Sequence, residues 1–594
     1  MADPLRGPLQ SAQVWAMRDS SLHERALKML GDEVPIAYDV ETSGTDYHDE
    51  LRLVQFGTET EAFVFDPHQF PDLVRHLAVR HRKIAHNAPF DALHLAKFTG
   101  IPASTILEHT TDTMILAHLV DPRDKLDGGT GRGLKELAAH YVDPDAPDGQ
   151  TALKQRFKEL GFKIADGFAQ IDLWDPTFVL YAGLDVILTA RLVAPLMELI
   201  TKYGLKELSE FDHQVQVLTT SMTERGMAVD VDYSSQLVED LERQAEAAEQ
   251  RATVYGVHNV NSTAQVAEGL LVRGIELSET TPSGAWKVDK NVLEGLDDDL
   301  ARLVLEAKGA RKAISSWVEP IIEHGHRDGR VHPRIKTLAA RTSRMSITDP
   351  PLQQLPSTDH HVRSCLIADP GMSLIACDFS QIEFRVLAAL SSEPSMIRTF
   401  EQGGDLHSAT AARLFGDDFT KAHRKLAKGV GFGQVYGGGA DTLARQAGVS
   451  KLEARKAMAQ FNRAFPRVKR WSTGLTDKVT HGEPIVTLPT NRRIPIERKF
   501  GYRATNYMIQ GLAADLFKGS LLELDRLGLA DQLLIPVHDE IIAQAPTQDA
   551  DEFAHAVADA MSGEFGPVPI VAEADVIGSS WGDAYRPQES HASH

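Results

Sequence analysis

Carboxylates near the N-terminus are the first residues whose spacing could do chemistry. Asp39 and Glu41 stand two residues apart in IAYDVETSG, whose pattern predicts a strand. Successive side chains of a strand point to opposite faces, so these two carboxylates share one face. They repel one another unless a cation neutralises them, and a hard divalent cation such as Mg²⁺ prefers oxygen ligands. A lone pair of this kind is more often a solvated strand face, so the interpretation depends on other segments.

Two later segments supply the groups that such a site would need. HNAPFDALHL predicts a helix with Asn87 at its N-cap, which places Asp91 near the start of that helix. YAGLDVILTARL places Tyr181 and Asp185 one turn apart on another helix, and an unpaired carboxylate among such apolar residues is costly. Four carboxylates and a tyrosine suit a two-metal phosphodiester hydrolase, in which metals about 3.5–4 Å apart activate a water and stabilise the leaving oxygen.

These segments resemble a known family. The three motifs of DEDDy-type 3′–5′ exonucleases, which have a ribonuclease H-like fold, are similar to Asp39-x-Glu41, Asn87-x-x-x-Asp91 and Tyr181-x-x-x-Asp185. The resemblance implies that the four acids hold the metals and that Tyr181 orients the attacking water. Because all four acids are present, we expect an active nuclease.

A second group of candidate residues lies in the C-terminal half. CDFSQIEFRVLAAL places Asp378 at the end of a predicted strand. Ser380 and Glu383 then fit an S-x-x-E capping box at the start of the next helix, which explains these two residues but not Asp378. LLIPVHDEIIAQ places Asp539 and Glu540 at a tight turn between two apolar strands, where a turn alone would account for one acid.

A row of cationic and aromatic residues lies between these two motifs. HRKLAKGVGFGQVYGG repeats Arg424, Lys428, Phe432 and Tyr436 at every fourth residue, as along one side of a helix. Glycines are interleaved with this row, and each costs a helix about 1 kcal/mol relative to alanine. Because glycine permits close approach of the backbone to a ligand, we expect Gly431 to be needed for binding.

Together these stretches resemble family A (DNA polymerase I-like) DNA polymerases over about residues 34–585. DFSQIEFR resembles motif A, RKLAKGVGFGQVYG resembles motif B, and VHDE resembles motif C. Four more segments are similar in order and spacing, namely RTSRMSITDPPLQQLP, GDLHSATAARLFG, NYMIQGLAADLFKG and GSSWGD. Seven motifs in order, following an exonuclease-like segment, imply a DNA-directed DNA polymerase with a proofreading exonuclease.

The resemblance also implies the catalytic roles in the C-terminal half. Asp378 and Asp539 would each bind two Mg²⁺ ions, one lowering the pKa of the primer 3′-hydroxyl and the other holding the triphosphate. Glu540 would have a secondary role nearby. We expect two Mg²⁺ ions in each of the two active sites, with Mn²⁺ able to substitute.

The implied partners are dNTPs and primer–template DNA. Arg424 and Lys428 would contact the triphosphate where negative charge develops, and Glu383 would exclude ribonucleotides. The other implied nucleotide-binding residues are Phe432 at the sugar, Tyr436 near the templating pair, and His407. Every base pair offers minor-groove acceptors, so contacts there need not read the sequence. Such contacts are implied for Arg344, Asn506, Gln510 and His538.

Five positions depart from the family pattern. Ser343 stands where glycine is usual, Ile347 where serine is usual, and Gly431 where asparagine is usual. Pro536 replaces a residue that is usually able to donate a hydrogen bond, and its missing N–H predicts an edge strand. Arg503 is one residue closer to the following glutamine than the family arginine, so we transfer no DNA contact to it.

Composition limits the class of protein. The 594-residue chain has a net charge of −21, which alone disfavours a nucleic-acid partner. The basic islands KAHRKLAK, PRVKR, NRR and ERK in the C-terminal half allow a basic groove on an acidic body.

Two cysteines suit a reducing cytosol, and the start of the chain has no secretory pattern. No apolar run reaches the roughly 20 residues that span a bilayer. We expect a cytoplasmic protein, in a bacterium or a phage-infected host, that contacts no membrane.

The elements that must position these residues predict an α/β multidomain protein. Early strands are predicted at 34–40, 51–57 and 61–67, with helices at 71–81, 90–98 and 113–120. The segment 205–330 is mostly helical by pattern. The predicted domains are a ribonuclease H-like exonuclease (1–204) and a right-hand polymerase with thumb (205–330), palm (331–395 and 485–594) and fingers (396–484).

The sequence leaves several functions open. We expect a replicative phage polymerase, because the residues ahead of the exonuclease segment are too few for a 5′-nuclease domain and this compact layout resembles phage replicative enzymes. We also expect a monomer. The alternatives are a bacterial repair-type polymerase that lacks this domain, an exonuclease whose second half only binds DNA, a single-subunit RNA polymerase, and a non-catalytic acidic scaffold. Glu383 and the exonuclease segment argue against an RNA polymerase. Helicase or single-strand-binding partners cannot be read from the sequence.

Overall fold

A six-stranded mixed sheet forms the N-terminal unit of the molecule. The computed structural model describes residues 12–144, 149–356, 360–435 and 438–585. The sheet has the order β1-β4-β3-β2-β5-β6. Its strands are β1 (Gln13–Met17), β2 (Ile36–Thr42), β3 (Leu51–Gly57), β4 (Glu61–Phe65), β5 (Lys83–Ala85) and β6 (Thr110–Asp112). Because β2 pairs antiparallel with β3 and parallel with β5, it lies inside the sheet.

Helices cover this sheet and bury its side chains. They include α2 (Pro71–Val79), α3 (Ala88–Thr99), α5 (Thr113–Val120), α6 (Leu134–Tyr141) and α9 (Pro176–Lys202). The three strands and three helices predicted from the first 120 residues are confirmed. Strand β1 was not among the predicted elements.

Helix α9 is long and apolar, but it belongs to the core. By length and composition it could cross a bilayer, although it contains no uninterrupted apolar run of that length. Most of its apolar window, 67%, is buried inside the protein, and the helix carries Asp185. It contacts β1, β2, β3 and β4, as a core helix of a sheet protein does.

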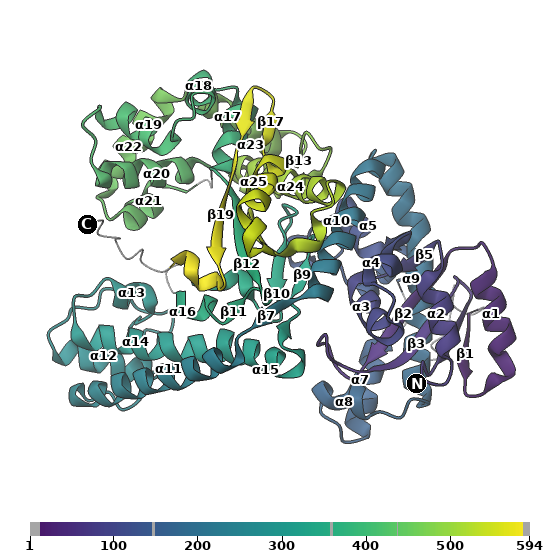
Figure 1. Cartoon of the computed structure of the whole chain (residues 1–594). Coiled ribbons are helices and arrows are strands. Elements are labelled where there is room, and N and C mark those ends of the chain that lie inside the picture. The colour runs from purple at the N-terminus through teal and green to yellow at the C-terminus, as the bar shows by residue number, and fades with distance from the viewer. Residues whose placement is uncertain (1–11, 145–148, 357–359, 436–437, 586–594) are drawn as a thin grey trace.

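The middle of the chain is helical, as its pattern predicts. Its main helices are α10 (Lys206–Arg225), α11 (Val231–Ala252), α14 (Asp299–Ala313) and α15 (Glu319–Asp328). In Figure 1, α11 and α14 lie side by side in an arm that extends away from the N-terminal sheet. Their shared core includes the small residues Ala248, Ala252 and Ala307, which allow the two helices to approach closely.

A four-stranded antiparallel sheet forms the centre of the C-terminal half, in the order β15-β16-β12-β19. Its strands are β12 (Met372–Phe379), β15 (Leu533–Val537), β16 (Glu540–Pro546) and β19 (Ala572–Gly578). The hairpin predicted around HDE is confirmed as β15–β16, and Pro536 lies on the edge strand, as its missing N–H predicts. Helices α17 (Ile382–Ser391), α24 (Ala504–Arg526) and α25 (Ala550–Met561) pack with this sheet in the largest core of the described residues.

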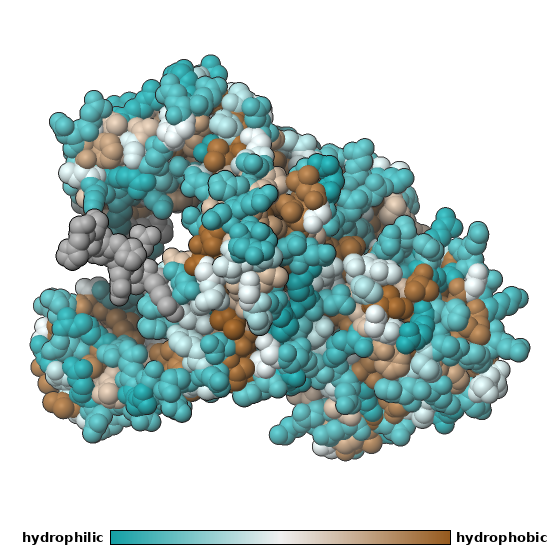
Figure 2. Space-filling model, viewed as in Figure 1, coloured by the Kyte–Doolittle hydropathy of each residue, from teal (hydrophilic) through white to brown (hydrophobic). Residues whose placement is uncertain are grey.

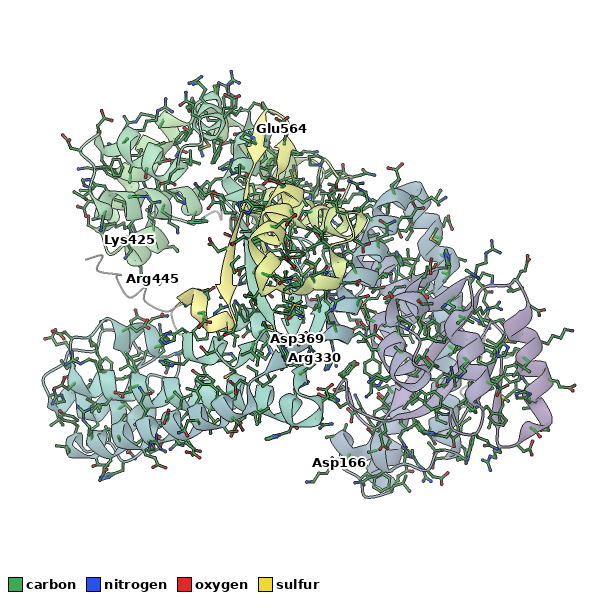
Figure 3. The ribbon with its side chains drawn as sticks, viewed as in Figure 1. Asp166, Arg330, Asp369, Lys425, Arg445 and Glu564 are labelled. Atoms are coloured by element: carbon green, nitrogen blue, oxygen red, sulfur yellow. The ribbon has the colours of Figure 1, made fainter. Side chains whose placement is uncertain are left out.

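A helical lobe inserts between α17 and α24 in the sequence. It contains α18 (Pro394–Glu401), α19 (Leu406–Phe415), α20 (Lys421–Val435), α21 (Ala440–Ala447), α22 (Lys451–Ala464) and α23 (Pro466–His481). Figure 2 shows the surface hollowed between this lobe and the α11–α14 arm. In Figure 3, Lys425 and Arg445 lie on the part of the lobe that borders the hollow. Positive charge therefore lies beside the hollow, although the whole chain is acidic.

The arm and the sheet meet at an ion pair. Arg330 lies on the short strand β8 (Arg330–Val331), and its Nη1 is 2.6 Å from Oδ1 of Asp369 just before β12 (Figure 3). Arg330 Nε also donates to the carbonyl of Arg225, the last residue of α10. One guanidinium therefore ties three segments together at the base of the arm.

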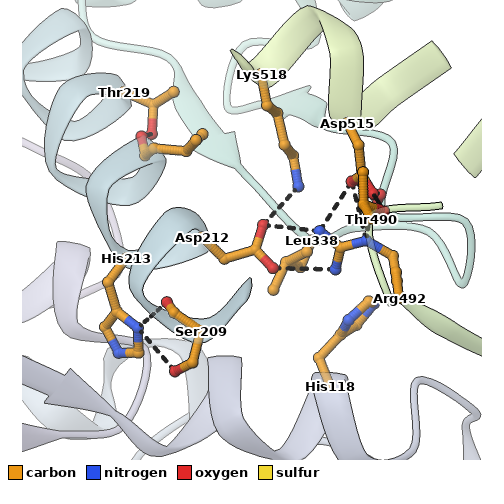
Figure 4. A network of polar contacts seen from close by, with 12 residues as sticks. His118, Ser209, Asp212, His213, Thr219, Leu338, Thr490, Arg492, Asp515 and Lys518 are labelled. Carbon is orange, nitrogen blue, oxygen red and sulfur yellow. Dashed lines mark hydrogen bonds and ion pairs between the residues drawn. The ribbon is translucent and has the colours of Figure 1, made fainter. Parts of the chain in front are cut away.

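A buried ionic network joins α10, α24 and the segment before α24 (Figure 4). Arg492 Nη1 lies 3.0 Å from Asp212 Oδ2, and its Nε donates to Asp515 Oδ1 at 2.9 Å. Lys518 Nζ donates to Asp212 Oδ1 at 3.1 Å. Burial opposes ionisation of Asp212, but Arg492 and Lys518 prevail and hold its pKa below the usual range. Each charge in the network is therefore compensated.

Replacing Asp212 by alanine should destabilise the protein by about 3–5 kcal/mol, because it leaves two buried cations without their carboxylate. The lowered pKa of Asp212 means that its stabilising effect is present above the unfolded-state pKa and is lost as the pH falls through the folded-state value. Chemical denaturation of Asp212→Ala and the parent at neutral pH measures the difference. The matched control is Asp240→Ala, which removes an exposed ion pair with Arg243 and should cost under about 1 kcal/mol. Equal losses in the two variants would contradict the argument.

Candidate active sites

The first cluster of acids forms on the central strand of the N-terminal sheet. Asp39 and Glu41 lie on β2, and Asp39 stands opposite Gln55 on β3. The Gln55 side-chain amide donates to Asp39 Oδ2 at 2.8 Å and to Glu41 Oε1 at 3.2 Å. One amide reaches both carboxylates, so the predicted placement on a single face is confirmed.

The other two acids come from helices α3 and α9. Asp91 lies in the first turn of α3, and its Oδ1 accepts a hydrogen bond from the backbone N–H of Val40, between the two acids of β2. Asp185 is buried on α9, one turn after Tyr181. The structure therefore brings Asp91 to the β2 pair, as expected.

The start of α3 differs from the prediction in one detail. Asn87 occupies the N-cap position, but its side chain makes no capping hydrogen bond and its φ is 66°. The buried carboxylate of Asp112, at the end of β6, instead accepts from the backbone N–H groups of Asn87 and Ala88. An acid from a neighbouring strand thus caps the helix, which a local pattern could not reveal.

Lys135 is a site residue that the sequence analysis missed. It lies in the first turn of α6, and its ammonium forms an ion pair with Asp185. The same nitrogen is 5.0 Å from the centre of the Tyr181 ring. The charge of Lys135 also lowers the pKa values of Asp39 and Glu41, against the effect of burial. The only sequence signal was a lysine two residues after Gly133, at the start of the segment GLKELAAHYV.

The acids of this cluster carry more negative charge than their neighbours compensate. Burial raises the pKa values of Glu41 and Asp91 well above their usual range, and the charge of Asp39 raises both further. Burial likewise raises the pKa of Asp39. A divalent cation would supply the missing charge, and an all-oxygen donor set fits a hard cation. The cluster therefore has the chemistry of a metal site.

The second cluster of acids forms where β12 and β16 pair. Asp378 near the end of β12 stands opposite Glu540 at the start of β16. The backbone N–H of Phe379 donates to the carbonyl of Asp539, which lies in the turn before β16. His538 in the same turn has a φ of 59°, so the chain reverses sharply there. The register of two strands thus brings Asp378 to Asp539 and Glu540, which are more than 150 residues later in the sequence.

Partial burial raises the pKa values of these acids as well. It raises those of Asp378 and Asp539, and the charge of Asp539 raises that of Asp378 further. Burial and the charge of Asp378 raise the pKa of Glu540 to about 7. Arg363 opposes this effect on Glu540, and its guanidinium lies 4.3 Å from the centre of the Trp581 ring. These carboxylates also have the oxygen donors and the uncompensated charge of a divalent-metal site.

The predicted capping box at the start of α17 is wrong. The helix begins at Ile382 with Gln381 at the N-cap, in a left-handed conformation and without a capping hydrogen bond from its side chain. Ser380 thus precedes the N-cap, which moves Glu383 out of the position that such a box requires. The carboxylate of Glu383 instead pairs with Arg344. Glu383 is therefore held toward the turn that carries Arg344.

Arg424, Lys428 and Phe432 of the predicted row lie on α20, so the helix is confirmed over these residues despite its glycines. Exposed Arg424 pairs with Asp405, the N-cap of α19, with Nη2 and Oδ2 2.8 Å apart. Burial opposes ionisation of Asp405, but hydrogen bonds from Ser408 and Arg424 hold its pKa at about 2. Lys428 Nζ lies 5.8 Å from the centre of the Phe432 ring. Tyr436 lies outside the described residues.

Aromatic rings link the row to α17 and α19. Phe384 on α17 contacts Phe432 and His407, with ring centres 5.1 Å apart in both pairs. The centres of His407 and Phe432 are 6.0 Å apart. The structure therefore brings together His407 and Phe432, which the resemblance implies as nucleotide-binding residues, around a ring that it did not implicate.

Gly431 has a packing reason for lacking a side chain. A Cβ atom there would lie 2.9 Å from Cε1 of Phe384, closer than real Cβ contacts. The glycine was expected to admit a ligand, whereas in the structure it makes room for the Phe384 ring of a neighbouring helix. Gly433, two residues later, would meet nothing closer than a carbonyl oxygen at 3.8 Å.

Gly431→Ala should therefore displace Phe384 and weaken dNTP binding. Overpacking costs typically about 1–3 kcal/mol, so we expect the KM for dNTP to rise roughly tenfold. Steady-state primer extension measures this change, and Gly433→Ala is the control because it adds the same methyl group to the same helix without a clash. An unchanged KM in Gly431→Ala would show that Phe384 can move freely.

The four residues implied in DNA contacts lie in two places, helix α24 and the surroundings of the second acid cluster. Asn506 and Gln510 are four residues apart on α24, so they share one face of that helix. Exposed Arg344 and His538 line a small cavity together with Asp539, which places them beside the second acid cluster. The buried Oδ1 of Asn506 has no hydrogen-bond partner within the described protein.

Two of the unusual positions have clear structural reasons. Ser343 has a φ of 60°, the left-handed region that glycine favours, and its hydroxyl donates to Asp515 in the ionic network. Ile347 is 1% exposed and fills the core under the short strand β10 (Ser346–Thr348), where a serine could not contribute the same apolar surface. The guanidinium of Arg503 lies over the ring of Phe500, so its positive charge makes a cation–π contact within the protein.

Comparison with known proteins identifies both halves of the chain. Residues 231–583 match the model for DNA polymerase family A, and residues 14–201 match the model for a 3′–5′ exonuclease. The DNA polymerase of Mycobacterium phage D29 is 37% identical over 568 residues, with 93% of each chain covered. The DNA polymerase of Mycobacterium phage L5 is 37% identical over 563 residues with the same coverage. DNA polymerase I of Chloroflexus aurantiacus is 30% identical over 84% of this chain and 54% of its own.

A solved structure shares the fold. The POL domain of Pol1 from M. smegmatis, in complex with a DNA primer-template and dNTP, has a TM-score of 0.78 at 23% identity. The match covers 96% of this chain and 100% of that one. Polymerases of family A and their exonuclease domains depend on divalent metals, which agrees with the oxygen-rich clusters described above. The comparisons do not favour the alternative functions. The chain belongs to family A of the DNA polymerases and is a DNA polymerase that carries a 3′–5′ exonuclease domain.

Proposed function

We propose that this protein is the replicative DNA polymerase of a phage, which extends a primed DNA strand from dNTPs and removes mismatched 3′ ends. Two phage DNA polymerases resemble it over 93% of both lengths, which supports the phage assignment. The structural neighbour was solved with a primer-template and dNTP, which supports the same partners for this chain. The observation that carries the proposal is the grouping of Asp378, Asp539 and Glu540 where β12 pairs with β16.

In the polymerase site, we assign two Mg²⁺ ions to Asp378 and Asp539. Such ions, when bound, activate the attacking oxygen and stabilise the leaving group. Arg424 and Lys428 would bind the triphosphate, for which Arg424 must leave its ion pair with Asp405. Glu383, held by Arg344, would occupy the space that a ribose 2′-hydroxyl needs.

In the exonuclease site, we assign two Mg²⁺ ions to Asp39, Glu41, Asp91 and Asp185. The ammonium of Lys135 must move away from Asp185 before a metal ion can bind there, because the ammonium and the metal ion need the same carboxylate. Tyr181 would then orient the attacking water. The residue pairs that hold the acids in place, such as Gln55 with Asp39, would keep the site ordered before metal binds.

The metal assignment is tested with chelator-treated enzyme on a primed template. We expect neither extension nor excision before metal is added, and recovery of both activities with Mg²⁺ or Mn²⁺. Extension without a divalent metal would contradict the two-metal mechanism. A preference for rNTPs over dNTPs would contradict the proposed substrate.

A further inference from the structure

A cluster of histidines and aspartates that shares no residue with either acid cluster lies at the junction of the exonuclease unit and the base of the arm. Asp46 and His48 lie in the loop between β2 and β3, while His324 and Asp328 lie one turn apart on α15. His332 follows β8. The ring centre of His48 is 6.0 Å from that of His324 and 5.5 Å from that of His332. Two segments almost 280 residues apart in sequence thus place three imidazoles together.

Part of this cluster is already satisfied by hydrogen bonds. One ring nitrogen of His332, Nδ1, lies 2.7 Å from the carbonyl of Thr223, and the other lies 2.9 Å from Asp328 Oδ2. The Tyr47 ring stacks on the His332 ring at 3.9 Å with an interplanar angle of 11°. His332 and Asp328 therefore form a fixed pair that has no ring nitrogen to spare.

Two ring nitrogens of the remaining residues make no hydrogen bond. His48 Nε2 and His324 Nδ1 are buried and have no hydrogen-bond partner among the described residues, although His48 Nε2 lies 3.8 Å from Asp328 Oδ1. The Asp46 carboxylate is 3.4 Å from His324 Nε2, and Asp46, His48 and His324 each offer a ligand atom within 4.8 Å of the other two. The residue His324 is 7% exposed. Buried nitrogens without partners are uncommon in folded proteins and call for an explanation.

We propose that Asp46, His48 and His324 bind a divalent transition metal of the zinc class. Two imidazoles and one carboxylate are a donor set that zinc accepts, with metal–ligand distances of about 2.0–2.2 Å and a fourth position for water. The three ligand atoms need to move together by roughly an ångström to reach these distances. Mg²⁺ prefers oxygen ligands only, so the imidazoles distinguish this site from both acid clusters.

One feature of the surroundings bears on access by an ion. A cavity of about 530 Å³ is lined by residues of the N-terminal unit, of α10 and of the segment after β8, and Asp46 is the one proposed ligand among them.

The metal would fix the position of strand β2, which carries two acids of the exonuclease site. The loop that carries Asp46 and His48 directly follows β2, which carries Asp39 and Glu41. This loop is otherwise held by Lys97, which donates to the carbonyl of Tyr47 at 2.7 Å, and by Arg334, which donates to the carbonyl of Thr45. A metal shared with α15 would lock the strand of the exonuclease site to the base of the arm.

The test is a count of zinc bound by the untagged, chelator-treated full chain in excess Mg²⁺, which competes at the all-oxygen clusters. A chromophoric chelator as competitor measures the count. We expect one equivalent of zinc in the parent and its loss in His48→Asn and in His324→Asn. His555→Asn is the matched control, because His555 is exposed on α25, far from this cluster in sequence.

Two further measurements keep the proposal open to refutation if a variant folds poorly. Co²⁺ in place of zinc should give the intense visible absorption of a four-coordinate site with nitrogen ligands in the parent. Zinc should also raise the Tm of the parent and not that of either histidine variant. A parent that binds no zinc in excess Mg²⁺, or histidine variants that bind as much as His555→Asn, would overturn the proposal.

Discussion

Replacing Asp378 by alanine is expected to abolish primer extension while leaving excision of a mismatched 3′ end intact. Asp378 faces Glu540 across the β12–β16 pair, and its carboxylate is one of two assigned to the metals. Metal stabilisation of a transition state is worth several kcal/mol, so its loss should slow nucleotide addition by roughly 10³-fold or more. Single-nucleotide incorporation under single-turnover conditions measures this rate directly.

The matched control for this variant is Asp575→Asn. Asp575 is an exposed acid on β19, opposite Ala376 of the same strand that carries Asp378. Its substitution removes one charge from the same sheet and should leave the extension rate within about twofold, as is usual for a surface change. A similar fall in both variants would mean that net charge, and not the carboxylate of Asp378, supports catalysis.

The double variant Asp39→Asn, Glu41→Gln is expected to lose excision by a similar factor and to retain extension. The two amides keep the volume of the acids and can still accept hydrogen bonds from Gln55, so the strand should fold normally. They lack the negative charge that a divalent cation requires, so the transition state should lose several kcal/mol of stabilisation by the metals. Release of nucleotide from a labelled single strand measures the loss.

Asp166→Asn is the control for this second prediction. Asp166 is exposed on α8 (Ile164–Gln170) within the exonuclease unit, and Figure 3 shows it at the margin of that unit. Its excision rate should match that of the parent. Excision that persists in the double variant would place the hydrolytic residues elsewhere.

The sequence predicted what depends on local period and missed what depends on partners. The period of two in a strand was enough to put Asp39 and Glu41 on one face, and the missing N–H of Pro536 was enough to place β15 at an edge. Lys135 could not be found in this way, because its meaning comes from Asp185 on another helix. The same holds for Asp112, which caps α3 from the end of a strand.

Local patterns also failed where tertiary contacts override them. Ser380 and Glu383 have the spacing of a capping box, yet the helix starts at Ile382 and Arg344 takes the carboxylate. The glycine at 431 suggested ligand access, while its closest neighbour is the ring of Phe384. The ionic network around Asp212 gave no sequence signal, because its partners Arg492 and Lys518 lie 280 and 306 residues later in the chain. The predicted domain boundaries and the nucleotide and DNA contacts stay predictions.

The most direct test of two separate active sites on one chain is a single primer with one mismatched 3′ nucleotide, followed over time with dNTPs and Mg²⁺. The parent should shorten the primer and then extend it to full length. Asp378→Ala should only shorten it, and the Asp39→Asn, Glu41→Gln variant should extend a matched primer but stall on the mismatched one. Loss of both activities in either variant, or full extension by Asp378→Ala, would contradict the assignment of the two reactions to the two acid clusters.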